Sequence, residues 1–149
     1  MDVRVDIDVP CEPSQIYPFV CDLVQYPQWM GLVHSAVLDP TAAGPTAWIV
    51  ELRGKIGPFA RSKRLRMQQV VADSPHHVRF ERNEEDGQQH GQWVLEVKIA
   101  DLSTDTVPNS SLKMTLHYGG RLFSSVVERA LQDEIEMSKK RLLNLVMPA

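Results

Sequence analysis

Segments in which apolar and polar side chains alternate fill most of this chain, and one long helical pattern follows the last of them. Residues at every second position of a strand lie on one face, so each segment predicts a strand with one buried and one solvated face. Apolar residues at helical spacing then cover residues 122–146. The predicted strands are residues 2–9, 35–38, 47–53, 59–72, 77–82, 92–102 and 111–118.

Two short helices are expected between the first and second strands. Residues 13–22 begin with Pro13, a residue favoured in the first turn of a helix. Pro18 lies inside this span, and a proline in mid-helix costs about 3 kcal/mol. We therefore expect Pro18 to lie near the first turn or to distort the helix. Residues 26–30 form the second short helix or turn.

This order of elements predicts an α+β fold. Consecutive strands joined by short turns pair antiparallel, which gives a curved sheet of about seven strands. Only the final helix, about 37 Å long at 1.5 Å per residue, is long enough to cover that sheet. Residues 1–149 are expected to form a single domain. A space between the sheet, the long helix and the short helices is the predicted site for a ligand.

Composition excludes several classes of protein. The formal net charge is −3, whereas a general nucleic-acid binder carries a basic excess. No window approaches the roughly 18 consecutive apolar residues of a membrane span, so no integral membrane association is expected. The first residues alternate charge with valine and do not resemble a secretory signal. Cys11 and Cys21 lie at opposite ends of a helix, about 15 Å apart and beyond disulfide reach. We expect a cytoplasmic monomer or homodimer.

One local pattern carries a family resemblance. Asp22 ends the first short helix, and Tyr26, Pro27 and Trp29 follow it in an Asp-x-x-x-Tyr-Pro-x-Trp arrangement. Together with the order of elements, this pattern resembles the START-like or SRPBCC superfamily, which includes the polyketide cyclase/dehydrase and lipid-transport family. The resemblance covers essentially the whole chain and implies the helix-grip fold, in which a sheet wraps around a long C-terminal helix. It does not imply one activity, because this fold hosts carriers, receptors, cyclases and hydrolases.

The residues expected to line the cavity share the inward parity of their strands or the apolar face of the final helix. Aromatic and methionine side chains in such a wall suit a hydrophobic ligand, although the same side chains can simply pack against one another. The predicted ligand-binding residues are Trp48, Val50, Leu65, Met67, Phe80, Arg82, Trp93, Leu95, Met114, Leu116, Tyr118, Phe123, Val127 and Leu131.

Few polar side chains share that inward parity. Arg82, Lys63, Gln69 and Tyr118 are the candidates for binding a carboxylate, phenol or carbonyl group, or for polarising an enol. Charges at strand ends can instead reach water. Because no acid–base set converges, we favour a binding protein or carrier for a lipid, isoprenoid or polyketide-like molecule, and assign no catalytic residue. The alternative is an aromatase/cyclase-type enzyme, and a third is an interaction module.

Other motifs point to no cofactor. The five histidines show no spacing typical of a zinc or iron site, so no metal is expected. The glycine-containing segment 54–58 lacks the P-loop pattern and predicts a hairpin turn, placed where it can cover the cavity as a flap. The basic run 61–66 divides between the two faces of a strand and predicts solvated charges.

Overall fold

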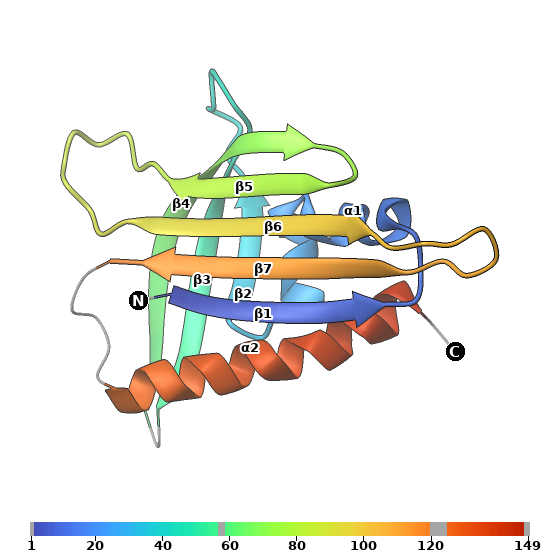
Figure 1. Ribbon diagram of the computed structural model, residues 1–149. Coiled ribbons are helices and arrows are strands. Elements are labelled where there is room, and N and C mark those ends of the chain that lie inside the picture. The colour runs from blue at the N-terminus through green and yellow to red at the C-terminus, as the bar shows by residue number, and fades with distance from the viewer. Residues whose placement is uncertain (1, 57–58, 120–124, 148–149) are drawn as a thin grey trace.

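The computed structural model describes residues 2–56, 59–119 and 125–147, without the side chains of residues 55, 56, 59–61 and 125–131. The predicted α+β architecture is confirmed (Figure 1). Its elements in chain order are β1 (Asp2–Val9), α1 (Pro13–Val20), η1 (Leu23–Gln28), β2 (Val33–Leu38), β3 (Ala47–Ile56), β4 (Phe59–Asp73), β5 (His77–Arg82), β6 (Trp93–Asp101), β7 (Ser110–Tyr118) and α2 (Ser125–Val146).

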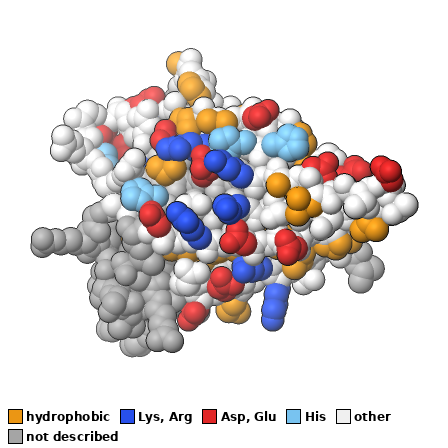
Figure 2. Space-filling model, in the orientation of Figure 1, with side chains coloured by type: hydrophobic (Ala, Val, Ile, Leu, Met, Phe, Trp, Pro, Cys, Tyr) orange, Lys and Arg blue, Asp and Glu red, His pale blue; other side chains and the backbone are white. Residues whose placement is uncertain are grey.

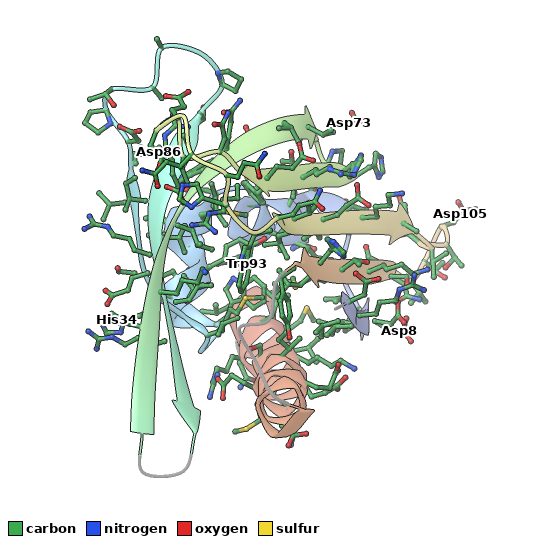
Figure 3. The ribbon with its side chains drawn as sticks, turned by 90° about the vertical axis from the view of Figure 1, so that its left-hand side faces the viewer. Asp8, His34, Asp73, Asp86, Trp93 and Asp105 are labelled. Carbon is green, nitrogen blue, oxygen red and sulfur yellow. The ribbon has the colours of Figure 1, made fainter. Side chains whose placement is uncertain are left out.

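The seven strands form one antiparallel sheet in the order β1-β7-β6-β5-β4-β3-β2. Strands β1 and β2 are neighbours in sequence but lie at opposite edges, and the short helices α1 and η1 join those edges. Figure 1 shows β2, β3 and β4 crossing steeply behind β1, β5, β6 and β7, so the sheet is strongly curved. Helix α2 lies in the hollow of this curve, as the view along the helix in Figure 3 makes clear.

The alternation in the sequence becomes the two faces of the sheet. In β1 all four even-spaced apolar residues from Val3 to Val9 are buried, and the residues between them are exposed. The outer face carries charges of both signs, which Figure 2 shows interspersed over β5, β6 and β7. Arg79, for example, pairs with Glu81 at 3.0 Å and with Glu96 at 3.4 Å. The apolar core therefore lies on the concave face, toward the helices.

The hairpin between β3 and β4 is longer than the sequence indicates. A turn is predicted to begin at Gly54, but the ladder continues past it, with Gly54 opposite Arg61 and Ile56 opposite Phe59. Glycine tolerates a strand interior even though it weakens one, so its presence does not end the strand. The hairpin projects beyond the rest of the sheet (Figure 3). The predicted flap centres on residues 57–58, which lie outside the described residues.

Helix α1 accommodates a proline in its interior. Pro13 occupies the start of the helix, and Pro18 lies five residues later and faces solvent. The helix ends two residues after Pro18. Its buried side chains, Ile16, Tyr17 and Val20, pack into the core beneath the sheet.

Candidate functional site: an apolar cavity between sheet and helices

A cavity of about 40 Å³ lies between the concave face of the sheet and the helices. Strands β1, β3, β4, β6 and β7 contribute to its wall, together with η1, the segment that joins η1 to β2, and α2. Its described lining residues are Val3, Val5, Leu23, Met30, Leu32, Val33, Val50, Leu52, Leu65, Met67, Trp93, Leu95, Met114, Leu116 and Ile135.

The wall of this cavity is almost wholly hydrocarbon. None of the fifteen described lining residues is charged, and the only side-chain nitrogen or oxygen among them is Nε1 of Trp93. An apolar ligand can enter such a site without stripping water from charged groups. The cavity therefore favours hydrophobic over ionic molecules.

Three methionines, Met30, Met67 and Met114, lie in the wall. A volume of about 40 Å³ holds a few water molecules, whereas small-molecule sites commonly enclose about 300–1,000 Å³. Methionine is unbranched and has three rotatable bonds, so it repacks around irregular shapes more easily than leucine or valine. Rotation of these side chains is the simplest way for the cavity to enlarge.

The indole of Trp93 differs from the other two in the chain. Trp93 is buried, with 2% of its surface exposed, and its Nε1–H has no hydrogen-bond partner in the structure. By contrast, Trp29 donates to the carbonyl oxygen of Phe19 at 3.1 Å, and Trp48 donates to Asp22 at 3.2 Å. The cavity wall thus contains one unpaired hydrogen-bond donor.

The structure brings seven of the predicted site residues to the cavity: Val50, Leu65, Met67, Trp93, Leu95, Met114 and Leu116. Three more are buried behind the wall. Trp48 and Phe80 pack edge to face with ring centroids 5.4 Å apart, and Tyr118 stacks on Trp93 at 5.1 Å. Phe123 lies outside the described residues, and Val127 and Leu131 lie in α2 with side chains outside them.

Arg82 lies away from this cavity. Its Nε donates to Glu84 at 2.8 Å, and its guanidinium also contacts the carbonyl oxygen of Gly91 and the ring of His90. These groups border an open, polar hollow formed by the loop between β5 and β6. Arg82 follows the last inward residue of β5, and the acidic loop draws its side chain away from the concave face. A role for Arg82 in ligand binding stays a prediction.

The other polar candidates also have local partners or lie outside the cavity wall. Gln69 donates to the carbonyl oxygen of Cys21 at 3.0 Å and so ties β4 to the end of α1. Lys63 is half-buried, and burial, followed by the nearby charge of Arg82, lowers its pKa, while Glu84 opposes this shift. Neither residue lines the cavity.

Sequence reasoning missed several lining residues. Val3 and Val5 were recognised as buried but not as part of the site, because nothing in the sequence places β1 beside β7. Leu32 and Val33 lie where η1 leads into β2, a stretch without clear periodicity. The missed lining residues are Val3, Val5, Leu23, Met30, Leu32, Val33, Leu52 and Ile135.

The Asp-x-x-x-Tyr-Pro-x-Trp pattern serves a structural role beside the cavity. The hydroxyl of Tyr26 donates to the carbonyl oxygen of Val20 at 2.8 Å, and Trp29 donates to that of Phe19. The two rings also pack together, with centroids 4.7 Å apart. Tyr26 is fully buried, and burial raises its pKa well above its usual range. These bonds hold η1 against α1 and so position the part of the wall that follows.

Comparison with known proteins gives one family. The sequence matches the family described as "Polyketide cyclase / dehydrase and lipid transport" over residues 1–146. No curated protein matches the chain. None of the helices in the described part of the chain is long and apolar enough to cross a membrane.

Solved structures share the fold at low sequence identity. A conserved protein from Geobacillus kaustophilus has a TM-score of 0.71 at 11% identity, with 98% of this chain and 95% of that one covered. A START superfamily protein from Mycobacterium smegmatis has a TM-score of 0.69 at 16% identity, covering 97% and 96%. The Zhui aromatase/cyclase from Streptomyces sp. R1128 has a TM-score of 0.68 at 11% identity, covering 98% and 93%. Likeness at this level of identity establishes the fold alone.

Proposed function

Since the chain belongs to the polyketide cyclase/dehydrase and lipid-transport family, we propose that it binds a hydrophobic small molecule in the apolar cavity. The ligand is a lipid, an isoprenoid or a polyketide-like molecule, and the protein acts as its carrier or binding protein. The observation that supports this function is the wall itself, which has fifteen described lining residues and no charged side chain among them. Transfer of an apolar molecule from water into such a wall is favourable.

Binding without chemistry fits the placement of the polar groups. General acid–base catalysis needs a titratable side chain within hydrogen-bond reach of the substrate. Within the described residues, Arg82 is paired with Glu84, Gln69 is bonded to the backbone of α1, and Lys63 does not line the cavity. A carrier requires none of these groups at its ligand.

The second candidate is a cyclase/dehydrase acting on a polyketide-like substrate. The family description and the likeness to an aromatase/cyclase favour it. The two functions differ in what they release. A carrier returns its ligand with unchanged mass, whereas a cyclase/dehydrase releases a product lighter by one water. Incubation with a polyketide-like substrate, followed by mass spectrometry of the extract, separates them.

Native mass spectrometry of protein purified without detergent, followed by organic extraction, tests the proposed function. We expect a stoichiometric apolar adduct, or, for protein that emerges empty, a rise in melting temperature with fatty acids, isoprenols or aromatic polyketides. An empty protein that none of these compounds stabilises would contradict the proposal.

A pair of valine variants makes the test specific to the cavity. Val50 is 3% exposed and lines the cavity, whereas Val37 on the neighbouring strand β2 is 63% exposed. Val50→Phe fills the cavity, at an overpacking cost of about 1–3 kcal/mol, and Val37→Phe makes the same change on the surface. Ligand binding should be lost in the folded Val50→Phe protein and kept in Val37→Phe.

A further inference from the structure

We propose that Trp93 is the polar anchor of the cavity and that the ligand presents to it one neutral acceptor oxygen, of the ketone type. This inference rests on the proposed function, because it assigns a ligand class to the same cavity. It starts from the unpaired Nε1–H of Trp93, which is the one N–H or O–H donor among the described side chains of the wall.

A buried indole N–H normally has a partner, because leaving such a donor unpaired is costly. The chain follows this rule at Trp29 and Trp48, whose N–H groups both bond to oxygen. Trp93 breaks the rule in the wall of a cavity. An acceptor carried by a bound molecule would satisfy it.

Water is a poor substitute for such a ligand. A buried water needs two to four polar partners, and the described wall offers only the Trp93 N–H. The free volume is sufficient for water, but the surroundings are hydrocarbon. A molecule that brings its own apolar body together with one acceptor fits better, because its body replaces the missing polar contacts with apolar ones.

The Trp93 ring is held in place before any ligand arrives. It lies at the start of β6, directly opposite Tyr118 in the ladder with β7. The two rings stack at 5.1 Å with 22° between their planes. Figure 3 shows Trp93 at the inner side of the sheet, where α2 approaches it. A donor fixed in this way loses little conformational freedom when a ligand binds.

The wall also limits the charge of the ligand. A carboxylate, phosphate or ammonium group would be buried without an opposite charge among the described lining residues, which is strongly unfavourable. One donor pairs with one acceptor. The three methionines accept either an aromatic or an alkyl body. The chemistry of the wall therefore points to an uncharged molecule with a single buried carbonyl oxygen.

Acetophenone and α-methylstyrene test this assignment, because they differ only in having =O or =CH₂ on the same skeleton. Their dissociation constants are measured by NMR titration for the wild type, Trp93→Phe and Trp48→Phe. Trp48→Phe is the matched control, since its indole is buried but bonds to Asp22 and does not line the cavity. The preference for the ketone should be about five- to tenfold greater in the wild type and Trp48→Phe than in Trp93→Phe.

The indole N–H signals provide a second measurement that needs only the wild type. The chain has three tryptophans, and Trp93→Phe identifies the Trp93 signal by its loss. The two remaining signals report whether that variant is folded. In the wild type, acetophenone should move the Trp93 proton downfield, and α-methylstyrene should not.

The outcomes separate this inference from the proposed function. If both probes bind but Trp93→Phe keeps the preference for the ketone, or the Trp93 proton responds equally to both, the anchor is wrong while the cavity still binds ligands. If neither probe binds the wild type, both proposals are overturned.

Discussion

Oδ1 of Asp22 accepts two hydrogen bonds, from Nε1 of Trp48 at 3.2 Å and from the backbone N–H of Val24 at 3.0 Å. The second bond caps η1, and the first ties that helix to β3. A single carboxylate therefore joins segments 26 residues apart. Asp22 belongs to the sequence pattern that resembles the family, and its contacts here are structural.

Replacing Asp22 with alanine should destabilise the protein. The variant loses a helix cap and leaves the Trp48 N–H without its partner, at a combined cost of about 1–3 kcal/mol. Thermal unfolding followed by circular dichroism should show a melting temperature lower by roughly 2–4 °C per kcal/mol. Asp8→Ala, at an exposed position of β1, is the control and should change stability by less than about 0.5 kcal/mol. Equal losses in both variants would refute the structural role.

Removing the Tyr26 hydroxyl should cost about 1–2 kcal/mol, because its 2.8 Å bond to Val20 is buried and the carbonyl oxygen would lose its partner. Tyr17→Phe removes a longer bond, 3.5 Å to the carbonyl oxygen of His77, and should cost less. Urea unfolding of both variants measures the difference. A larger loss in Tyr17→Phe than in Tyr26→Phe would show that the pattern does not depend on this hydroxyl.

Arg66 is expected to be the most sensitive cation of β4. It is only 6% exposed, and it donates to Asp39 and to the carbonyl oxygen of Asn83, both at 2.9 Å. Arg66→Met leaves both acceptors unpaired and should cost about 2–3 kcal/mol. Arg64→Met, two residues away on the same face and exposed, should be nearly neutral. Chemical denaturation of the two variants compares them directly, and similar stabilities would contradict this account.

Asp39 should make stability depend on acidic pH. Hydrogen bonds from Thr41, and then from Arg66, lower the pKa of Asp39 to about 2. Because the folded pKa lies below the unfolded one, this stabilisation is complete above about pH 4 and is lost as the pH falls toward 2. The free energy of unfolding should therefore decrease over that interval, and Asp39→Asn should reduce the slope. Asp105→Asn, in the exposed loop between β6 and β7, should leave the slope unchanged.

The strand pattern was predictable from the sequence because alternation reports burial directly. Val50, Leu65 and Leu95 follow the period of two and reach the cavity as expected. The segment containing Leu32 and Val33 was not assigned to the site, because Tyr26 and Trp29 hold it in place through contacts that no local pattern reveals.

Long-range partners account for the other differences. The basic run 61–66 predicts solvated charges, and this is wrong for Arg66, which the loop carrying Asn83 and the distant Asp39 enclose. The sequence contains three tryptophans without indicating which one lacks a hydrogen bond. The partners of Trp29 and Trp48 lie 10 and 26 residues away, so only the folded chain distinguishes Trp93 from them.

The pairing of β1 with β7 has a consequence during protein synthesis. Asp2 pairs with His117 and Val9 with Ser110, so β1 has no partner until almost the whole sheet has been translated. At about 5–20 residues per second, the nascent chain carries β1 unpaired for roughly 5–20 seconds. A bare apolar strand could join another nascent chain in that time, but the exposed positions of β1 hold three aspartates and an arginine. Charges on a free edge discourage such pairing, so the charged face of β1 protects the chain before it contributes to the fold.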